Sequence, residues 1–266
     1  MLFNKGVLLA TSLFIAALCA CPSSGLCRGV SWRGAVSEAM NNSFEDIIRE
    51  LTQPINGQYP RPWMTKLQDP LQAKVFIVGK NQAKTFSAQQ VGSHNRLLHA
   101  LFNRNGETCR DLYNQVTSTP SPTRHNIDAL TNYLEHRGIG EILETNVICY
   151  STPMSSDLAQ TLHQGSKQRG SEIFQTLLLY IHPPILIAHG SDTRKELGRV
   201  LGVKFISEPK QADEVIYQRV SHKGYEPIVF IIPSLALPAY NRWQRWASAH
   251  LNNLADEVAH QLDRYK

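Results

Sequence analysis

Two asparagines lie where apolar runs of the sequence end or break. Asn81 comes two residues after the apolar run 74–79, where a buried strand would open into a loop, and Asn146 lies within the run 142–150. A carboxamide can hold a water through its carbonyl, and it offers one acceptor and two donors to a flat ligand. The structural alternative is that Asn81 forms a turn with positive φ and that Asn146 bridges two strand ends.

Four apolar runs rich in β-forming residues must position these side chains; they span 74–79, 142–150, 184–190 and 227–234. Three of the four are nearly continuous, as expected for strands that helices cover on both faces. Helical patterns alternate with them, over 124–138, 166–182, 191–202 and 238–262. This alternation predicts a three-layer α/β/α fold with a central, mainly parallel, four-stranded sheet.

Polar loops follow each of the four predicted strands, with the sequences GKN, YST, HGSD and IPSL. Parallel strands bring such ends to one rim of the sheet, where open α/β folds bind their ligands. We therefore expect Asn81 and Asn146 to face one pocket.

Two smaller features complete the predicted fold. Ser191 is the expected N-cap of the third helix. The segments 203–207 and 214–220 are expected to form an edge hairpin.

The ordered motifs on these strand ends resemble the uracil-DNA glycosylase superfamily. The stretch VGKNQAKTFSAQQVGSHNRLL is similar to its first motif, LETNVICYSTP to its central strand, and PSLALPAYNRW to its last motif. The layout is closest to the single-strand-selective monofunctional and mismatch-specific branches, and the resemblance runs from about Lys74 to Trp246. It implies a uracil-DNA glycosylase-like fold over 40–266 and a monofunctional DNA glycosylase of base excision repair. Such an enzyme hydrolyses the N-glycosidic bond of uracil or a related damaged base, which it first flips out of the stack.

The resemblance also implies roles for the residues of the pocket. Asn81 would position the attacking water, and Asn146 would bond the N3–H and O4 edge of uracil, a pattern that cytosine inverts. Phe86 or His94 would stack on the flipped base, with a place in the core as the alternative for Phe86.

The last motif implies contacts with DNA. Pro233 and Ser234 would pinch a phosphate, and Arg242 would contact another. Leu235 or Leu237 would fill the gap that the flipped base leaves. Neighbouring Trp243 and Trp246 are better explained by helix packing.

Two departures from the family pattern matter for activity. Gln82 follows Asn81 where the family has proline, and Ile232 precedes Pro233 where the family usually has a histidine that stabilises the departing base. Losing one such donor typically costs about 2–4 kcal/mol of barrier. Backbone N–H groups, His94 or His189 would then have to replace it. No metal, iron–sulfur cluster or other cofactor is expected, because the cluster cysteines are missing; the expected partner is DNA, and the expected state is a monomer.

Composition leaves the compartment open. The net charge of +5 and the pI near 9.0 suit a polyanionic partner without requiring one. Residues 1–39 have the layout of a signal peptide, with Cys21 in a lipobox-like setting, yet Met40 opens a natural cytoplasmic start. We expect a cytoplasmic protein that starts at Met40, the alternative being one exported or lipid-anchored through Cys21. A non-catalytic nucleic-acid-binding relative and an exported lipoprotein remain alternative functions. Neither CxxC nor G-x-S-x-G occurs, which disfavours a zinc ribbon, a thioredoxin-type site and a serine hydrolase.

Overall fold

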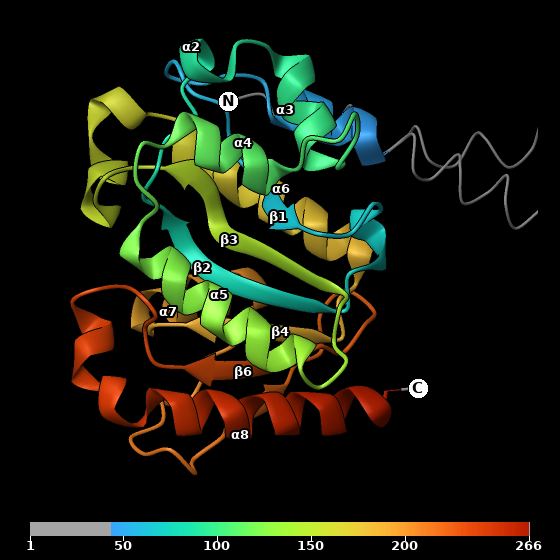
Figure 1. Ribbon diagram of the computed structural model, residues 1–266, viewed down its shortest axis with the longest axis vertical. Coiled ribbons are helices and arrows are strands. Elements are labelled where there is room, and N and C mark those ends of the chain that lie inside the picture. The colour runs from blue at the N-terminus through green and yellow to red at the C-terminus, as the bar shows by residue number, and fades with distance from the viewer. Residues whose placement is uncertain (1–43, 266) are drawn as a thin grey trace, which may run out of the picture. The chain divides into compact units, whose positions relative to one another are not determined.

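Six strands form one mixed sheet in the computed structural model, which describes residues 44–265 (Figure 1). Their order across the sheet is β1-β3-β2-β4-β6-β5. The strands are β1 (Trp63–Thr65), β2 (Val75–Gln82), β3 (Ile142–Ser151), β4 (Ile185–His189), β5 (Ile216–Arg219) and β6 (Ile228–Ile232). The segment 1–39, with Cys21, and the start at Met40 lie outside the described residues.

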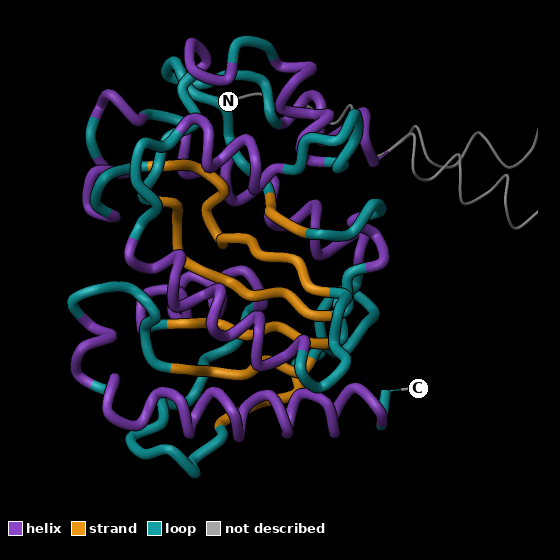
Figure 2. The backbone as a smooth tube through the Cα atoms, viewed as in Figure 1, coloured by secondary structure: helices purple, strands orange, loops and turns teal. Residues whose placement is uncertain are grey.

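The central strands β3, β2, β4 and β6 pair in parallel, and the edge strands β1 and β5 pair antiparallel with β3 and β6. Figure 2 shows the strands, in orange, side by side with helices packed around them. The α/β class is therefore confirmed, but the sheet has six strands and not the predicted four. Of the predicted edge hairpin, the segment 214–220 contains the edge strand β5, but the hairpin with 203–207 does not form. Residues 203–207 form no strand, because β5 pairs with the open edge of β6 instead.

Helices cover both faces of the sheet. They are α2 (Ala88–Val91), α3 (His94–Leu101), α4 (Cys109–Val116), α5 (Pro122–Glu135), α6 (Ser166–Ile181), α7 (Ser191–Leu201) and α8 (Gln244–Asp263), after helical residues 44–51. Short 3₁₀ turns are η1 (Pro70–Gln72), η2 (Ser155–Ala159), η3 (Thr161–His163) and η4 (Ala239–Arg242). No helix in the part of the chain that the structure describes is long and apolar enough to cross a membrane.

Alternate residues of each strand supply the two cores. In β2, Val75 and Ile77 pack with α5 and α8, whereas Phe76 and Val78 pack with α6 and α7. Figure 1 shows α5 and α8 side by side across the near face of the sheet. This two-sided burial explains the nearly continuous apolar runs, because each side chain of a covered strand leaves water.

Two helix starts differ from the prediction. Gly190 is the N-cap of α7, with φ +90°, so Ser191 is the first helical residue and not the cap. The predicted helix over 238–262 is interrupted: η4 ends at Arg242, Trp243 has a non-helical backbone, and α8 begins at Gln244. Before η4, residues 233–238 form a loop that directly follows the carboxyl end of β6.

Candidate active site

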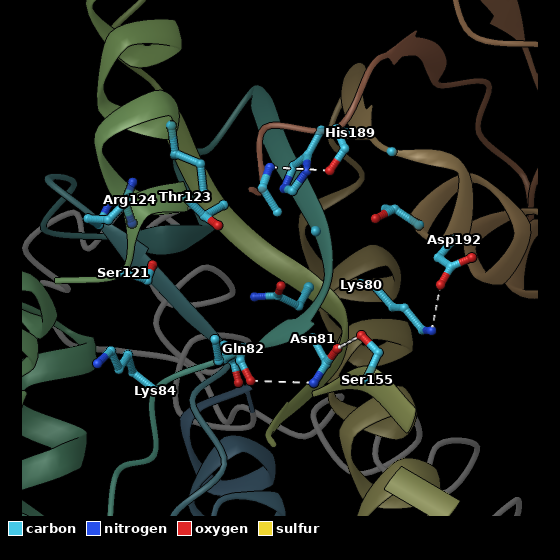
Figure 3. Close-up of a pocket in the computed structure, with 18 of the residues that line it drawn as sticks. Lys80, Asn81, Gln82, Lys84, Ser121, Thr123, Arg124, Ser155, His189 and Asp192 are labelled. Atoms are coloured by element: carbon cyan, nitrogen blue, oxygen red, sulfur yellow. Dashed lines mark hydrogen bonds and ion pairs between the residues drawn. The ribbon is translucent and has the colours of Figure 1, made fainter. Parts of the chain in front are cut away.

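A cavity of about 680 Å³ lies at the carboxyl ends of the central strands (Figure 3). Its lining includes Asn81 from β2, Asn146 from β3, His189 from β4 and Ser234 after β6. The structure thus brings both asparagines and the predicted phosphate-binding serine to one pocket. Parallel pairing is the reason, since it places all four carboxyl ends at one rim.

Asn81 is held rigidly at the pocket wall. Its Nδ2 donates to Thr152 Oγ1 at 2.8 Å. Its Oδ1 accepts from Ser155 Oγ at 2.7 Å (Figure 3). Both partners follow β3, where the chain turns over the end of β2. A carbonyl oxygen has two acceptor sites, so Oδ1 keeps one for a water after bonding Ser155.

Asn146 differs from Asn81, because its carboxamide is free. Among residues 44–265, the side-chain hydrogen bond that reaches Asn146 is from Cys149 Sγ to its backbone carbonyl, which leaves the carboxamide to the pocket. The residue pairs with Gly79 in the parallel register of β2 and β3. A β-carbon on Gly79 would lie only 2.5 Å from Asn146 Oδ1, so this carboxamide lies where a side chain at position 79 would be.

His189 lies on the other flank of Gly79, at the end of β4. Its Nε2 is 3.1 Å from the position of that same β-carbon, and its buried Nδ1 has no hydrogen-bond partner among the described residues. Burial, with a smaller contribution from the positive charge of Arg124, lowers the pKa of His189 to about 4. The imidazole is therefore neutral at pH 7, with one N–H to donate and one acceptor nitrogen.

The loop 233–238 is fixed from two sides. Trp243 Nε1 donates to Ser234 O at 2.9 Å, and Asn126 Nδ2 donates to Leu235 O at 2.7 Å. Pro233 is buried, and Ser234 Oγ accepts from the N–H of Ala236 at 3.2 Å. Trp243 is thus a packing residue of this loop.

The two leucines of the loop differ in exposure. Leu235 is 0% exposed and packs in the core with α8, whereas Leu237 is 47% exposed and lines the pocket. Of the two residues predicted to fill the gap left by a flipped base, Leu237 alone is exposed, and the burial of Leu235 corrects its assignment to that role. Arg242 is exposed in η4, after the loop and outside the pocket lining.

Neither predicted stacking residue reaches the pocket. Phe86 is 0% exposed in the core, below the guanidinium of Arg61, which corrects its assignment as a base-stacking ring. His94 stacks on Tyr59 and contacts Thr52 Oγ1 at 2.9 Å, away from the pocket lining. The structure therefore leaves the stacking role unfilled by either of them.

Several pocket residues carried no sequence signal. Lys80 pairs with Asp192 at 2.9 Å on one side of the pocket, and Ser121, Thr123 and Arg124 lie on the other (Figure 3). Thr152 and Ser155 follow the central strand in the sequence, so a polar loop was visible there, but not its contact with Asn81. Within residues 44–265, no group of histidine, cysteine or acidic side chains is arranged to hold a metal ion.

A comparison with protein-family models finds no match to this chain, and a search of curated proteins finds none either.

Proposed function

We propose that the chain is a monofunctional DNA glycosylase with a uracil-DNA glycosylase-like fold, which hydrolyses the N-glycosidic bond of uracil or a related damaged base. The observation that carries this proposal is the row Asn146–Gly79–His189 across three adjacent parallel strands. The glycine leaves a slot in the middle of the row, and a free carboxamide and a neutral imidazole flank it. Asn81 lies further along the same strand as Gly79.

The row is suited to binding a planar base by its edge. The free Asn146 carboxamide supplies a carbonyl that accepts from N3–H and an amide that donates to O4 of uracil. Cytosine presents the inverted pattern and would leave both groups unpaired, which is a strong basis for rejection. The order of motifs along the sequence supports the same assignment.

Asn81 positions the water that attacks the sugar. Its carboxamide is oriented by Thr152 and Ser155, and the residue lines the pocket. A positioned water suffices without a strong base if the sugar already has the positive character typical of glycoside cleavage.

His189 stabilises the departing base in place of the histidine that Ile232 has replaced. Ile232 is buried in β6, and His189 is its register partner on β4. The imidazole thus comes from the neighbouring strand at the same level of the sheet. A neutral histidine that donates one N–H can bind developing negative charge on the base without transferring its proton.

DNA reaches the pocket across the loop 233–238. Ser234 and the backbone of this loop bind one phosphate, Arg242 binds another, and Leu237 fills the space of the flipped base. The protein works where DNA is present, as a monomer.

A non-catalytic nucleic-acid-binding protein is the second candidate, and one observation favours it. The stacking residues expected from the family pattern, Phe86 and His94, do not line the pocket. Such a relative would bind DNA with the same loop but would release no base.

The test is a base-release assay on oligonucleotides that carry uracil, hypoxanthine, xanthine or ethenocytosine, with alkali to open the abasic site. We expect strand breakage after incubation with the wild-type protein for at least one of these lesions, and none for an undamaged control. Binding without breakage on every lesion would support the non-catalytic alternative. If the protein neither binds nor breaks any of these oligonucleotides, both candidate functions are contradicted.

A further inference from the structure

Arg61 is a buried arginine that forms no ion pair within residues 44–265; burial lowers its pKa, although the charge of nearby Glu144 acts to raise it. It is 7% exposed, and no carboxylate among the described residues forms an ion pair with it. Its guanidinium carbon lies 4.8 Å from the ring centroid of Phe86 and 5.0 Å from that of Tyr113. These ring contacts stabilise the cation, but they do not use its N–H groups, and Nη1 has no hydrogen-bond partner in the part of the chain that the structure describes. Buried charges are normally paired, so this guanidinium is an unexplained donor in the pocket wall.

The residues around Arg61 form a positively charged end of the pocket. The Tyr113 hydroxyl beneath Arg61 accepts from the Ser121 N–H at 3.1 Å, which places Arg61 beside the start of α5. The Ser121 hydroxyl does not cap this helix. Lys84 and Thr123 also line the pocket, and Figure 3 shows both on the same side as Ser121, away from Lys80.

Arg124 adds a second donor at this end. It is 4% exposed, and its Nη2 has no partner within residues 44–265. Its other nitrogens pair with Asp128, at 3.0 Å, and with Glu144. Glu144 is a carboxylate that lines the pocket here, and the pairing with Arg124 neutralises it. The uncompensated charge at this end therefore belongs to Arg61 and Lys84.

We propose that this end of the pocket is a phosphate subsite, with Arg61 as its central ligand and Arg124, Lys84, Ser121 and Thr123 around it. The planar fork of a guanidinium matches the oxygens of a phosphate, and a helix N-terminus with free hydroxyls favours the same anion. The volume agrees: about 680 Å³ is within the range of roughly 300–1,000 Å³ that takes a drug-sized ligand, and is more than one flat base requires. The phosphate of a nucleotide would fill the space beyond the base slot.

The subsite is tested by titrating the full chain with inorganic phosphate at constant ionic strength in a calorimeter, without any base-release step. Arg61→Met keeps the length of the side chain and removes the charge, and we expect it to weaken phosphate binding about tenfold or more. Lys84→Met should weaken it less, about threefold. Lys84 is partly exposed at the pocket mouth, so this variant gives a result even if Arg61→Met does not fold. The control is Arg264→Met, an exposed arginine near the end of the chain, which should bind phosphate within twofold of the wild type.

A second arm identifies where the phosphate comes from. Single-stranded oligonucleotides with and without a 5′-phosphate are titrated into the same variants. If Arg61→Met weakens both oligonucleotides, the subsite binds an internal phosphodiester; if it weakens the phosphorylated one alone, it binds a terminal phosphate. The proposal is overturned if the wild type binds no phosphate at millimolar concentration, or if a folded Arg61→Met or Lys84→Met protein matches the wild type. Because the readout is phosphate binding, a chain without glycosylase activity can still pass this test.

Discussion

Asn146 Oδ1 and His189 Nε2 lie on either side of one empty position: a β-carbon built on Gly79 would be 2.5 Å from the first atom and 3.1 Å from the second. Three neighbouring strands supply these three residues at the same level. The glycine is thus required by the side chains of its neighbours and not by an unusual backbone angle. The proposed base slot exists because β2 carries no side chain there.

Gly79→Ala should close this slot. The added methyl group must displace the Asn146 carboxamide, so we expect base release to fall about 10²-fold or more while the protein stays folded. Single-turnover kinetics and thermal melting measure the two effects. Gly140→Ala is the matched control, because a β-carbon there meets no atom within 4 Å. Equal loss of activity in both variants would contradict the slot.

His189→Leu removes the imidazole N–H and supplies no other donor, so it should lower base release about 10²–10³-fold, the typical effect of removing one donor to a developing anion. DNA binding should change little, because the donor acts on the barrier and not on the bound substrate. Comparing the single-turnover rate with the dissociation constant for the same oligonucleotide separates these effects. An unchanged rate would contradict this role of His189, and backbone N–H groups would then have to stabilise the departing base.

The stability of the fold should depend on His189 below pH 6.5. Its pKa is about 4 in the folded protein and about 6.5 in the unfolded chain, so the unfolded chain takes up a proton first as the pH falls. The contribution of the neutral ring is complete above pH 6.5 and is lost between 6.5 and 4. From pH 7.5 to 5, the wild type should lose roughly 2 kcal/mol more unfolding free energy than His189→Gln. Urea unfolding at both pH values measures this, and equal losses would contradict the burial of a neutral ring.

The two loop leucines should respond in opposite ways. Leu235→Ala removes a core side chain and should cost about 2–5 kcal/mol of stability. Leu237→Ala removes an exposed one and should leave stability within about 0.5 kcal/mol. Because a wedge residue holds the base out of the duplex, Leu237→Ala should slow release from double-stranded DNA more than from single-stranded DNA. If it slows neither, Leu237 has no wedge role.

The sequence contains the information for the sheet centre and much less for its edges. The four parallel strands are visible because burial on two faces requires continuous apolar residues. By contrast, β1 has only three residues, and β5 alternates partly buried and exposed side chains. The pattern of β1 does not differ enough from that of a loop, whereas the run 214–220 indicated the edge strand that forms as β5 but not its pairing with β6.

The candidate site, like the fold, was predictable only in part from the sequence. Asn81 and Asn146 follow from the rule that parallel strands share a rim. The direction of a side chain after a strand end depends on the loop, which is why Phe86 lies in the core and why Leu237, two residues after Leu235, is the exposed leucine. His189 depends on register with Ile232, and the positions of Arg61 and Arg124 depend on how β1 and α5 pack around the pocket. Such relations are properties of the folded chain and leave no local pattern.

The most direct test of the account is the single-turnover rate of base release by Asn81→Ala, on whichever lesion the wild-type protein cleaves. Asn132→Ala, an exposed asparagine of α5, serves as the control. Because the proposed role of Asn81 is to position the water and not to bind DNA, the rate should fall about 10²-fold or more with nearly unchanged affinity for DNA, and the control should match the wild type. If Asn81→Ala releases the base as fast as the wild type, the carboxamide at the end of β2 does not hold the attacking water, and the proposed mechanism is wrong.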